Sequence, residues 1–397
     1  MTPVRSFLVV AACLAHAAPL SAQAQTYTID QFLSPASPLE MSAARKADRL
    51  AWVSYERGMR NIYVASAPGF QATRITRFLA DDGVDLGSVK LSDDGSMAIF
   101  VRGHGQNRDG WVANPSHDPR GADRAVWAAR TDGSGAWRLA SIANTQPGGG
   151  RGGSPELSPD GRYVVFVRDG QIYRASTARG PKTAMDTAGV PFIRAWGRQS
   201  NPVWSPDGTK LAFVSTRENH AFIAVYDVPT RSVKYLAPST DFDASPTWSP
   251  DSKRIAFIRR PGTPFGQQVP RGGAFGQAAT PAQPGPGKGC RPPGGGFGGG
   301  GFGAPVVDTL PVDGLCRAAF AGGYTIAFMV GDAATGEARE FWHNQPKDPK
   351  FVAINGITWA GDHVVFTAPI PGDEWDRHFS VRISNPAPEP VLLTTSD

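Results

Sequence analysis

Short apolar runs, each preceded by the same kind of polar turn, recur in the middle of the chain. Asn201–Gly208 is followed by the run Lys210–Val214, and Ser245–Ser252 is followed by Arg254–Ile258. The turn residues have physical roles, because Pro presets φ, Asp bonds its own backbone and Gly accepts positive φ. A short β-prone run after such a turn predicts a buried strand, so each unit predicts a β-hairpin.

The two units are offset by 44 residues, measured from Trp204 to Trp248. Two more strands are predicted between them, at Phe222–Asp227 and Val233–Leu236. Four strands in roughly 44 residues is the size of one β-propeller blade. Trp204, Trp248 and Trp359 occupy the same place before the turn, which predicts aromatic side chains buried between blades.

The turn-and-strand signal occurs six times along the chain. It predicts an all-β protein, a β-propeller of about six four-stranded blades. Without a further blade, such a ring is expected to stay open and to leave strand edges unpaired. The six apolar runs, of which the first follows a degenerate turn, are Leu50–Val53, Met97–Val101, Tyr163–Val167, Leu211–Val214, Ile255–Ile258 and Val364–Thr367.

One interval in the repeat is too long for a single blade, because Trp248 and Trp359 are 111 residues apart. Between Pro261 and Pro305, 25 of 45 residues are Gly or Pro. This composition buries too little apolar surface to offset the entropy of ordering, so residues 261–305 are predicted to be a disordered insertion within one blade. The blade is expected to resume at Tyr324–Val330.

The first residues predict a secretory signal peptide. Arg5 supplies a positive charge, Phe7–Leu14 is an apolar stretch, and Ala22–Ala24 is a small-residue cleavage site. A lipoprotein box ending at Cys13 is the weaker alternative, because it leaves a very short apolar stretch. The domains are therefore expected at residues 1–24 for the signal peptide and 25–397 for the propeller, with a periplasmic or secreted location and no membrane span.

Two cysteines remain after the signal segment, Cys290 and Cys316. They form a possible disulfide in an oxidising compartment, and their spacing fits no zinc pattern. The net charge is +5, of which the insertion holds three positive charges and Arg5 one. The remaining charges of both signs are interspersed, so a nucleic-acid partner is not expected.

The sequence offers no motif for nucleophilic, metal or cofactor chemistry. The G-x-S-x-G motif is absent, and its nearest match, Gly152–Ser154, has Glu156 at the last position. We predict no catalytic residue, no metal and no cofactor, and the binding residues stay unknown. The histidines after the predicted signal peptide, which lack the H-E-x-x-H spacing of a zinc site, are His104, His117, His220, His343, His363 and His378.

Two segments have a structural interpretation and a functional alternative. The turn aspartates suggest calcium ligands, but repeated Asp-Gly at hairpin positions favours ordinary turn chemistry. The charged and aromatic segment Gly372–His378 favours a solvated turn, with a contact at the channel mouth as the alternative. The turn aspartates are Asp94, Asp160, Asp207 and Asp251.

Several of these motifs resemble a known family. The Ser-Pro-Asp-Gly hairpins, the segment Gly331–Arg339 and the ending Glu389–Thr394 resemble the N-terminal propeller of secreted bacterial prolyl oligopeptidase family serine peptidases, in the dipeptidyl peptidase IV-like branch. The resemblance covers about Tyr27 to Asp397. TolB-type propellers carry similar hairpins, and the segments at Gly331–Arg339 and Glu389–Thr394 favour the peptidase family.

The resemblance implies a propeller that covers a C-terminal α/β-hydrolase domain and filters peptide substrates by size. The catalytic residues of that family lie in the hydrolase domain, which these 397 residues lack. No Glu-Glu pair occurs, so the amine-binding glutamates of dipeptidyl peptidases are also missing. The first expectation is therefore a non-catalytic propeller portion, from a truncated or split gene, whose partner is a peptide or a separately encoded hydrolase domain. The alternative is a stand-alone periplasmic TolB-like propeller that binds a protein or peptide.

Overall fold

Every regular element in the described part of this computed structural model is a β-strand. The predicted signal peptide at residues 1–24 and Cys316 lie outside this part, as does most of the predicted insertion, so these remain predictions. The described residues contain no helix long and apolar enough to cross a membrane. The structure describes residues 37–107, 111–119, 121–145, 153–180, 188–262, 283–284, 290–291, 319–346, 348, 350–352, 354, 356–370, 373 and 375–394.

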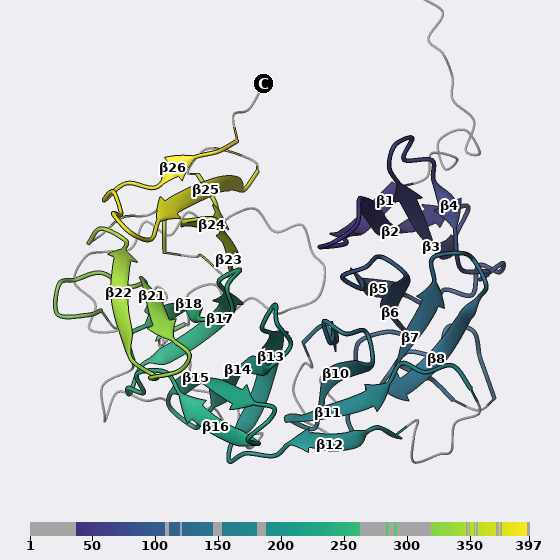
Figure 1. The fold of residues 1–397 in the computed structure, drawn as a ribbon, viewed down its shortest axis with the longest axis horizontal. Coiled ribbons are helices and arrows are strands. Elements are labelled where there is room, and N and C mark those ends of the chain that lie inside the picture. The colour runs from purple at the N-terminus through teal and green to yellow at the C-terminus, as the bar shows by residue number, and fades with distance from the viewer. Residues whose placement is uncertain are drawn as a thin grey trace, which may run out of the picture.

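Six four-stranded antiparallel units follow one another along the chain and surround a common centre (Figure 1). Four of them are separate sheets, and the fourth and fifth are joined into one eight-stranded sheet by a single parallel pair, Ala221 with Phe242. We number the six units blades 1 to 6, and the first strand of each is its inner strand. This confirms the predicted propeller of six blades. Blades 1 to 3 consist of β1 (Ser37–Ala43), β2 (Arg49–Glu56), β3 (Met59–Ser66) and β4 (Thr73–Arg74); β5 (Leu86–Leu91), β6 (Met97–Arg102), β7 (Ala125–Arg130) and β8 (Ala136–Ser141); and β9 (Glu156–Leu157), β10 (Tyr163–Arg168), β11 (Gln171–Ser176) and β12 (Val190–Ile193).

Blade 5 is built from two segments that are distant in sequence, because β18 pairs with β21 across the long insertion. The short pair β19 (Gln283–Pro284) and β20 (Cys290–Arg291) lies within that interval and is separate from the blades. Blades 4 to 6 consist of β13 (Arg198–Trp204), β14 (Lys210–Thr216), β15 (Ala221–Asp227) and β16 (Ser232–Tyr235); β17 (Phe242–Trp248), β18 (Arg254–Arg260), β21 (Ala327–Asp332) and β22 (Ala338–His343); and β23 (Ile357–Ala360), β24 (His363–Ala368), β25 (Arg377–Arg382) and β26 (Val391–Leu392).

The second strand of a blade is a continuous apolar run because both faces of the blade are covered. In β14, Leu211 and Phe213 pack toward blade 3, whereas Ala212 and Val214 pack toward blade 5. Successive side chains of a strand point to opposite faces, so a strand between two neighbours needs apolar residues at every position. This requirement explains why the repeat has no polar alternation.

Five hydrophobic clusters hold the six blades together in the described residues, one at each junction between consecutive blades. Trp204, Trp248 and Trp359 are each buried at such a junction, as predicted from their register. Inner strands contact one another in order, from β1 through β5, β9, β13 and β17 to β23. Figure 1 shows blades 1 and 6 facing each other across an interval that no described strand fills.

Candidate functional site

The strand order gives the propeller two different ends. At the end that we call the turn end, connections join the first strand to the second and the third to the fourth. At the opposite end, the loop end, connections join the second strand to the third and link one blade to the next. The longest connections, from β6 to β7, from β8 to β9 and from β18 to β21, lie at the loop end, whereas β2–β3 and β10–β11 are tight turns there. Loops on a rigid scaffold are where binding residues concentrate, so the loop end is the better candidate surface.

Three tryptophans are exposed in the described residues, and all three lie in connections at the loop end. Trp111 lies between β6 and β7, Trp196 between β12 and β13, and Trp375 between β24 and β25. Their exposed fractions are 74%, 83% and 70%. Aromatic side chains exposed on a rigid surface are typical anchors of protein interfaces. Trp375 belongs to the segment Gly372–His378 and is solvated, which agrees with the favoured interpretation of that segment.

Trp196 stands over a cluster of aromatic rings around one arginine. The Arg217 guanidinium lies 5.0 Å from the Trp196 ring centroid and 5.6 Å from that of Phe222. Arg217 also donates to the Tyr235 hydroxyl at 3.1 Å and to the Ser215 hydroxyl at 2.7 Å. Cation–π contacts and hydrogen bonds therefore fix the guanidinium, so that Trp196 has a rigid base beneath its exposed ring.

A buried ion pair lies at the loop end of blade 5. Arg259 donates to both carboxylate oxygens of Asp243, from Nε at 2.7 Å and from Nη2 at 2.9 Å, and Nη2 also donates to the Ala237 carbonyl at 2.8 Å. The Asp243 side chain is fully buried. Burial raises the pKa of Asp243 to about 6, and the hydrogen bonds from Arg259 oppose that effect. The pair joins the first two strands of the blade where the long insertion departs.

Two of the histidines in the described residues have carboxylate partners. His104 contacts Asp85 at 2.7 Å and the Gly83 carbonyl at 2.8 Å. His343 contacts Glu340 at 2.6 Å, and Glu340 also accepts a 3.0 Å hydrogen bond from Tyr324. Burial, followed by that hydrogen bond, raises the pKa of Tyr324 to about 12. These contacts tie aromatic rings and carboxylates of neighbouring strands and loops together.

Polar side chains of the inner strands meet between blades 2 and 3. Lys90 on β5 forms an ion pair with Glu156 on β9, and the Ser154 hydroxyl donates to that of Ser88 at 3.2 Å. Only 18% of the Glu156 side chain is exposed, so burial raises its pKa while Lys90 opposes the rise. These contacts place polar side chains at the junction of the inner strands of blades 2 and 3.

The turn aspartates bind protein donors, which confirms the structural interpretation of the Ser-x-Asp turns. In the turn of blade 4, the Ser205 hydroxyl donates to Asp207 at 2.6 Å, and the Thr209 amide donates to the same carboxylate at 2.9 Å. The equivalent hydroxyl bond lowers the pKa of Asp94 and of Asp251. Within the described residues, no three His, Cys, Asp or Glu side chains gather closely enough to hold a metal ion.

Replacing Ser205 with Ala is expected to lower the free energy of unfolding by about 1–3 kcal/mol, because the fully buried hydroxyl also accepts from the Lys210 amide. Urea denaturation of the purified protein measures this change. Thr209→Ala is the matched control, because it removes a hydroxyl that also donates to Asp207, at 2.9 Å, but keeps the buried contact between Ser205 and Lys210, and it is expected to stay within about 0.5 kcal/mol. Equal losses for the two variants would contradict the structural role of the serine.

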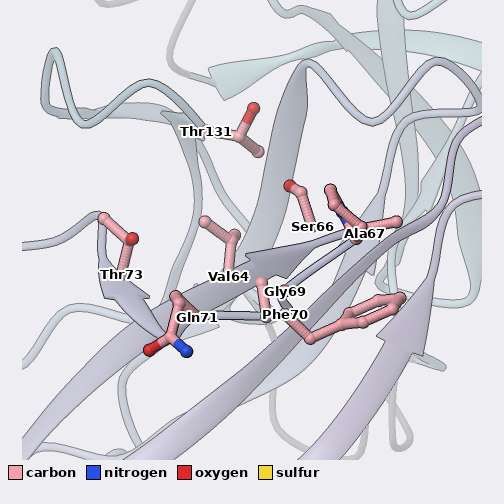
Figure 2. A pocket seen from close by; sticks show the side chains of 10 residues that line it. Val64, Ser66, Ala67, Gly69, Phe70, Gln71, Thr73 and Thr131 are labelled. Carbon is pink, nitrogen blue, oxygen red and sulfur yellow. The ribbon is translucent and has the colours of Figure 1, made fainter.

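A shallow hollow lies at the turn end of blade 1, between the third and fourth strands (Figure 2). Its volume is about 240 Å³, below the range of roughly 300–1,000 Å³ that is typical of small-molecule sites. Ser66, Gln71, Thr73 and Thr131 supply its polar side chains. None of these side chains is ionisable near neutral pH.

Most of this surface was not predicted from the sequence. The segment of Trp375 was noticed because of its composition, but Trp111 and Trp196 were missed. Their position relative to the repeat would have identified them, because both lie outside the repeated turn-and-strand units, in connections at the loop end. Cys290 lies in β20, but its side chain is not described and Cys316 lies outside the described residues, so their pairing remains a prediction.

No protein-family model and no curated protein matches the chain. Among solved structures, a prolyl endopeptidase is similar over 92% of this chain and 44% of its own, with 12% identity and a TM-score of 0.54. A puromycin-hydrolysing peptidase of Mycobacterium tuberculosis is 14% identical over 89% of this chain and 44% of its own, with a TM-score of 0.48. TolB of Acinetobacter baumannii is 21% identical over 57% of this chain and 49% of its own, with a TM-score of 0.39.

The similarity to the prolyl endopeptidase supports the fold that the strands show. The chain is a β-propeller similar to that of a prolyl endopeptidase, although at 12% identity the likeness concerns the fold alone. The chain spans less than half the length of that protein.

Proposed function

We propose that this chain is the non-catalytic propeller portion of an exported serine peptidase of the prolyl oligopeptidase family, in the dipeptidyl peptidase IV-like branch. In this role its loop end faces a hydrolase domain and restricts which peptides reach the active site. The observation that carries the proposal is the loop end itself, where Trp111, Trp196 and Trp375 are exposed on a rigid ring of blades. The family resemblance of the repeat and the similarity to the prolyl endopeptidase fold support it.

Two features of the ring suit a gate for peptides. The exposed tryptophans offer apolar anchors at the loop end, and the Lys90–Glu156 pair places opposite charges at the junction of the inner strands of blades 2 and 3. A peptide that passes through the ring meets backbone, charge and small hydroxyls, which discriminate by size more than by side-chain identity. Catalysis is left to a partner, because the sequence lacks the G-x-S-x-G nucleophile.

The first test asks whether the chain is catalytically silent. The purified protein is incubated with a serine-directed fluorophosphonate probe and with a peptide library. We expect no labelling and no cleavage, with a complete prolyl oligopeptidase family enzyme as the positive control. Labelling that disappears on heat denaturation, or turnover of any peptide, would sink the non-catalytic role.

The second test concerns the partner. The DNA downstream of codon 397 is read for a hydrolase segment with G-x-S-x-G, and that segment is co-expressed with the chain. We expect a one-to-one complex whose affinity falls at least about tenfold in Trp196→Ala or Trp375→Ala, because buried tryptophans dominate interface energetics. Phe70→Ala is the control, since Phe70 is an exposed aromatic residue at the turn end. Equal weakening by all three variants would argue against the loop end as the interface.

The alternative function is a stand-alone periplasmic propeller, similar to TolB, that binds a protein or peptide partner. The exposed tryptophans favour a binding role of this kind equally well, since they require a partner but no hydrolase. The DNA sequence downstream of codon 397 distinguishes the two functions. If no hydrolase segment is encoded nearby, the stand-alone binding function is supported and the gating role loses its basis.

A further inference from the structure

The inner strand of blade 1 differs from its five counterparts at one register position. This position lies two residues before the last ladder pair with the second strand in β1, β5, β9, β13 and β17, and in β23 it lies two residues before Trp359, which is in the penultimate pair. In β1 it is Met41, which is 66% exposed. In every later blade the residue at this position is buried, and Val89 and Ile357 belong to the cluster at the junction with the preceding blade. These counterparts are Val89, Pro155, Pro202, Pro246 and Ile357.

The exposed position belongs to a larger apolar face of blade 1. Trp52 and Tyr63 stack on this face with ring centroids 6.0 Å apart, and each is only partly buried. The other side of blade 1 packs against blade 2 through Ala51 and Val53. Blade 1 therefore has the two apolar faces of an interior blade, and within the described part of the chain a neighbouring blade packs on only one of them.

At each of the five junctions between blades, such a face is covered by one side of the preceding blade. Alternate residues of the second and third strands of that preceding blade form the covering side. The four central positions of that side are all apolar in blades 1, 2, 4 and 5. In blade 3 one of the four positions is Arg174. In blades 2, 4 and 5 they are Ile99, Val101, Val126 and Ala128; Ala212, Val214, Ile223 and Val225; and Ala256, Ile258, Phe328 and Val330.

Blade 6 does not supply this surface. At the four corresponding positions it has Val365, Thr367, His378 and Ser380, and both Thr367 and His378 are exposed. A polar outer face is the usual feature of a terminal repeat. Closing the ring by direct contact between blades 6 and 1 would bury these polar groups against Met41 and Trp52, at a cost in lost hydration.

We propose that the face of blade 1 formed by Met41, Trp52 and Tyr63 is an interface for one further four-stranded blade of the same repeat. That blade is apolar on the side toward blade 1 and polar on its inner strand, which lies against Thr367 and His378. The occupant that we propose is a partner polypeptide that presents such a blade, since the described residues form six blades and no seventh.

The test uses methionine oxidation, which reports access to the sulfur atom. In the protein as it exists, dilute peroxide followed by mass spectrometry is expected to oxidise Met41 at least about tenfold faster than Met97 and Met329. The latter two are buried methionines and serve as internal controls. Slow oxidation of Met41 in the dilute protein would show that the face is already covered and would overturn the proposal. Protection that appears only at high protein concentration would assign the face to a second copy, and also overturn it.

The occupant is tested by adding a blade. A copy of residues 198–241, which form blade 4 and its link, is appended after Asp397. We expect Met41 oxidation to slow about tenfold, to the rate of Met97. The matched control copy carries Val214→Thr, Ile223→His and Val225→Ser, the polar residues that blade 6 has at those positions, and is expected to leave Met41 reactive.

Equal oxidation rates with the apolar and polar copies would contradict the proposed interface. A second comparison does not depend on whether the appended copy folds. In the unextended protein, Met41→Ser is expected to leave the melting temperature unchanged, whereas Val89→Ser lowers it, because only Val89 is buried against a preceding blade. A similar loss for both variants would show that Met41 is already packed.

Discussion

Trp248→Ala is expected to lower the free energy of unfolding by about 3–5 kcal/mol. The side chain is 94% buried at the junction of blades 4 and 5, and its indole nitrogen donates to the Val203 carbonyl at 3.0 Å. Truncation leaves a cavity between two blades that are joined by few backbone hydrogen bonds, so the junction has little else to compensate. Urea denaturation followed by circular dichroism measures the loss.

Two variants separate packing from the other effects of removing a tryptophan. Trp248→Phe keeps an aromatic ring but loses the hydrogen bond to Val203, so a smaller loss of about 1–3 kcal/mol is expected. Trp375→Ala removes an exposed ring and is expected to change stability by less than about 0.5 kcal/mol. If Trp375→Ala cost as much as Trp248→Ala, burial at the junction would not be the cause.

Arg259→Ala is expected to destabilise the protein by about 3–5 kcal/mol, because it leaves the Asp243 carboxylate buried without its bidentate partner. The loss should also depend on pH. In the wild-type protein the pKa of Asp243 is raised to about 6, above its value of about 3.9 in an unfolded chain. A raised pKa means that stability from this group is fully present below about pH 3.9 and is lost as pH rises through about 6.

Without Arg259, the pKa of Asp243 rises further, because the favourable positive charge is gone. The free energy of unfolding of the variant therefore continues to fall above pH 6. In the wild type, Asp243 is already ionised above that pH and no longer changes the free energy of unfolding. Denaturation at pH 5 and pH 8 is expected to show a larger difference between variant and wild type at pH 8. A difference that is the same at both pH values would exclude an ionised, unpaired Asp243 as its cause.

The control for this experiment removes both charges. The double variant Asp243→Leu/Arg259→Met replaces the pair with apolar side chains, and we expect a stability within about 1–2 kcal/mol of the wild type at both pH values. A loss as large as that of Arg259→Ala would mean that the pair does more than neutralise charge, for example by holding the Ala237 carbonyl through Nη2.

The fold was largely predictable because each blade repeats the same physical solution. The turn with Asp207 and the apolar run Leu211–Val214 specify a hairpin locally, and Trp204 marks the end of the inner strand. The same signals located the blade that resumes after the insertion, where β21 begins at Ala327. The degenerate first copy was also recognised, because its apolar run survives the loss of its turn motif.

The candidate site was much less predictable. Trp111 and Trp196 lie in connections that have no repeat, so nothing in their neighbours along the chain distinguishes an exposed tryptophan from a buried one. The pairing of Asp243 with Arg259 joins the start of one strand to the end of the next, and depends on the register that the bulge in β17 creates. Such contacts follow from strand pairing and not from spacing in the sequence.

The sequence by itself determined the repeat, the four strands of each blade and the buried place of Trp204, Trp248 and Trp359, because local turns and apolar runs are sufficient to form hairpins. Only the tertiary structure decided which apolar residues stay uncovered. Met41 and Val89 occupy equivalent positions in equivalent strands, yet one is exposed and the other is buried. The difference arises because burial at a blade junction depends on a neighbouring sheet, and the position of that sheet is fixed by the ring and not by the strand itself.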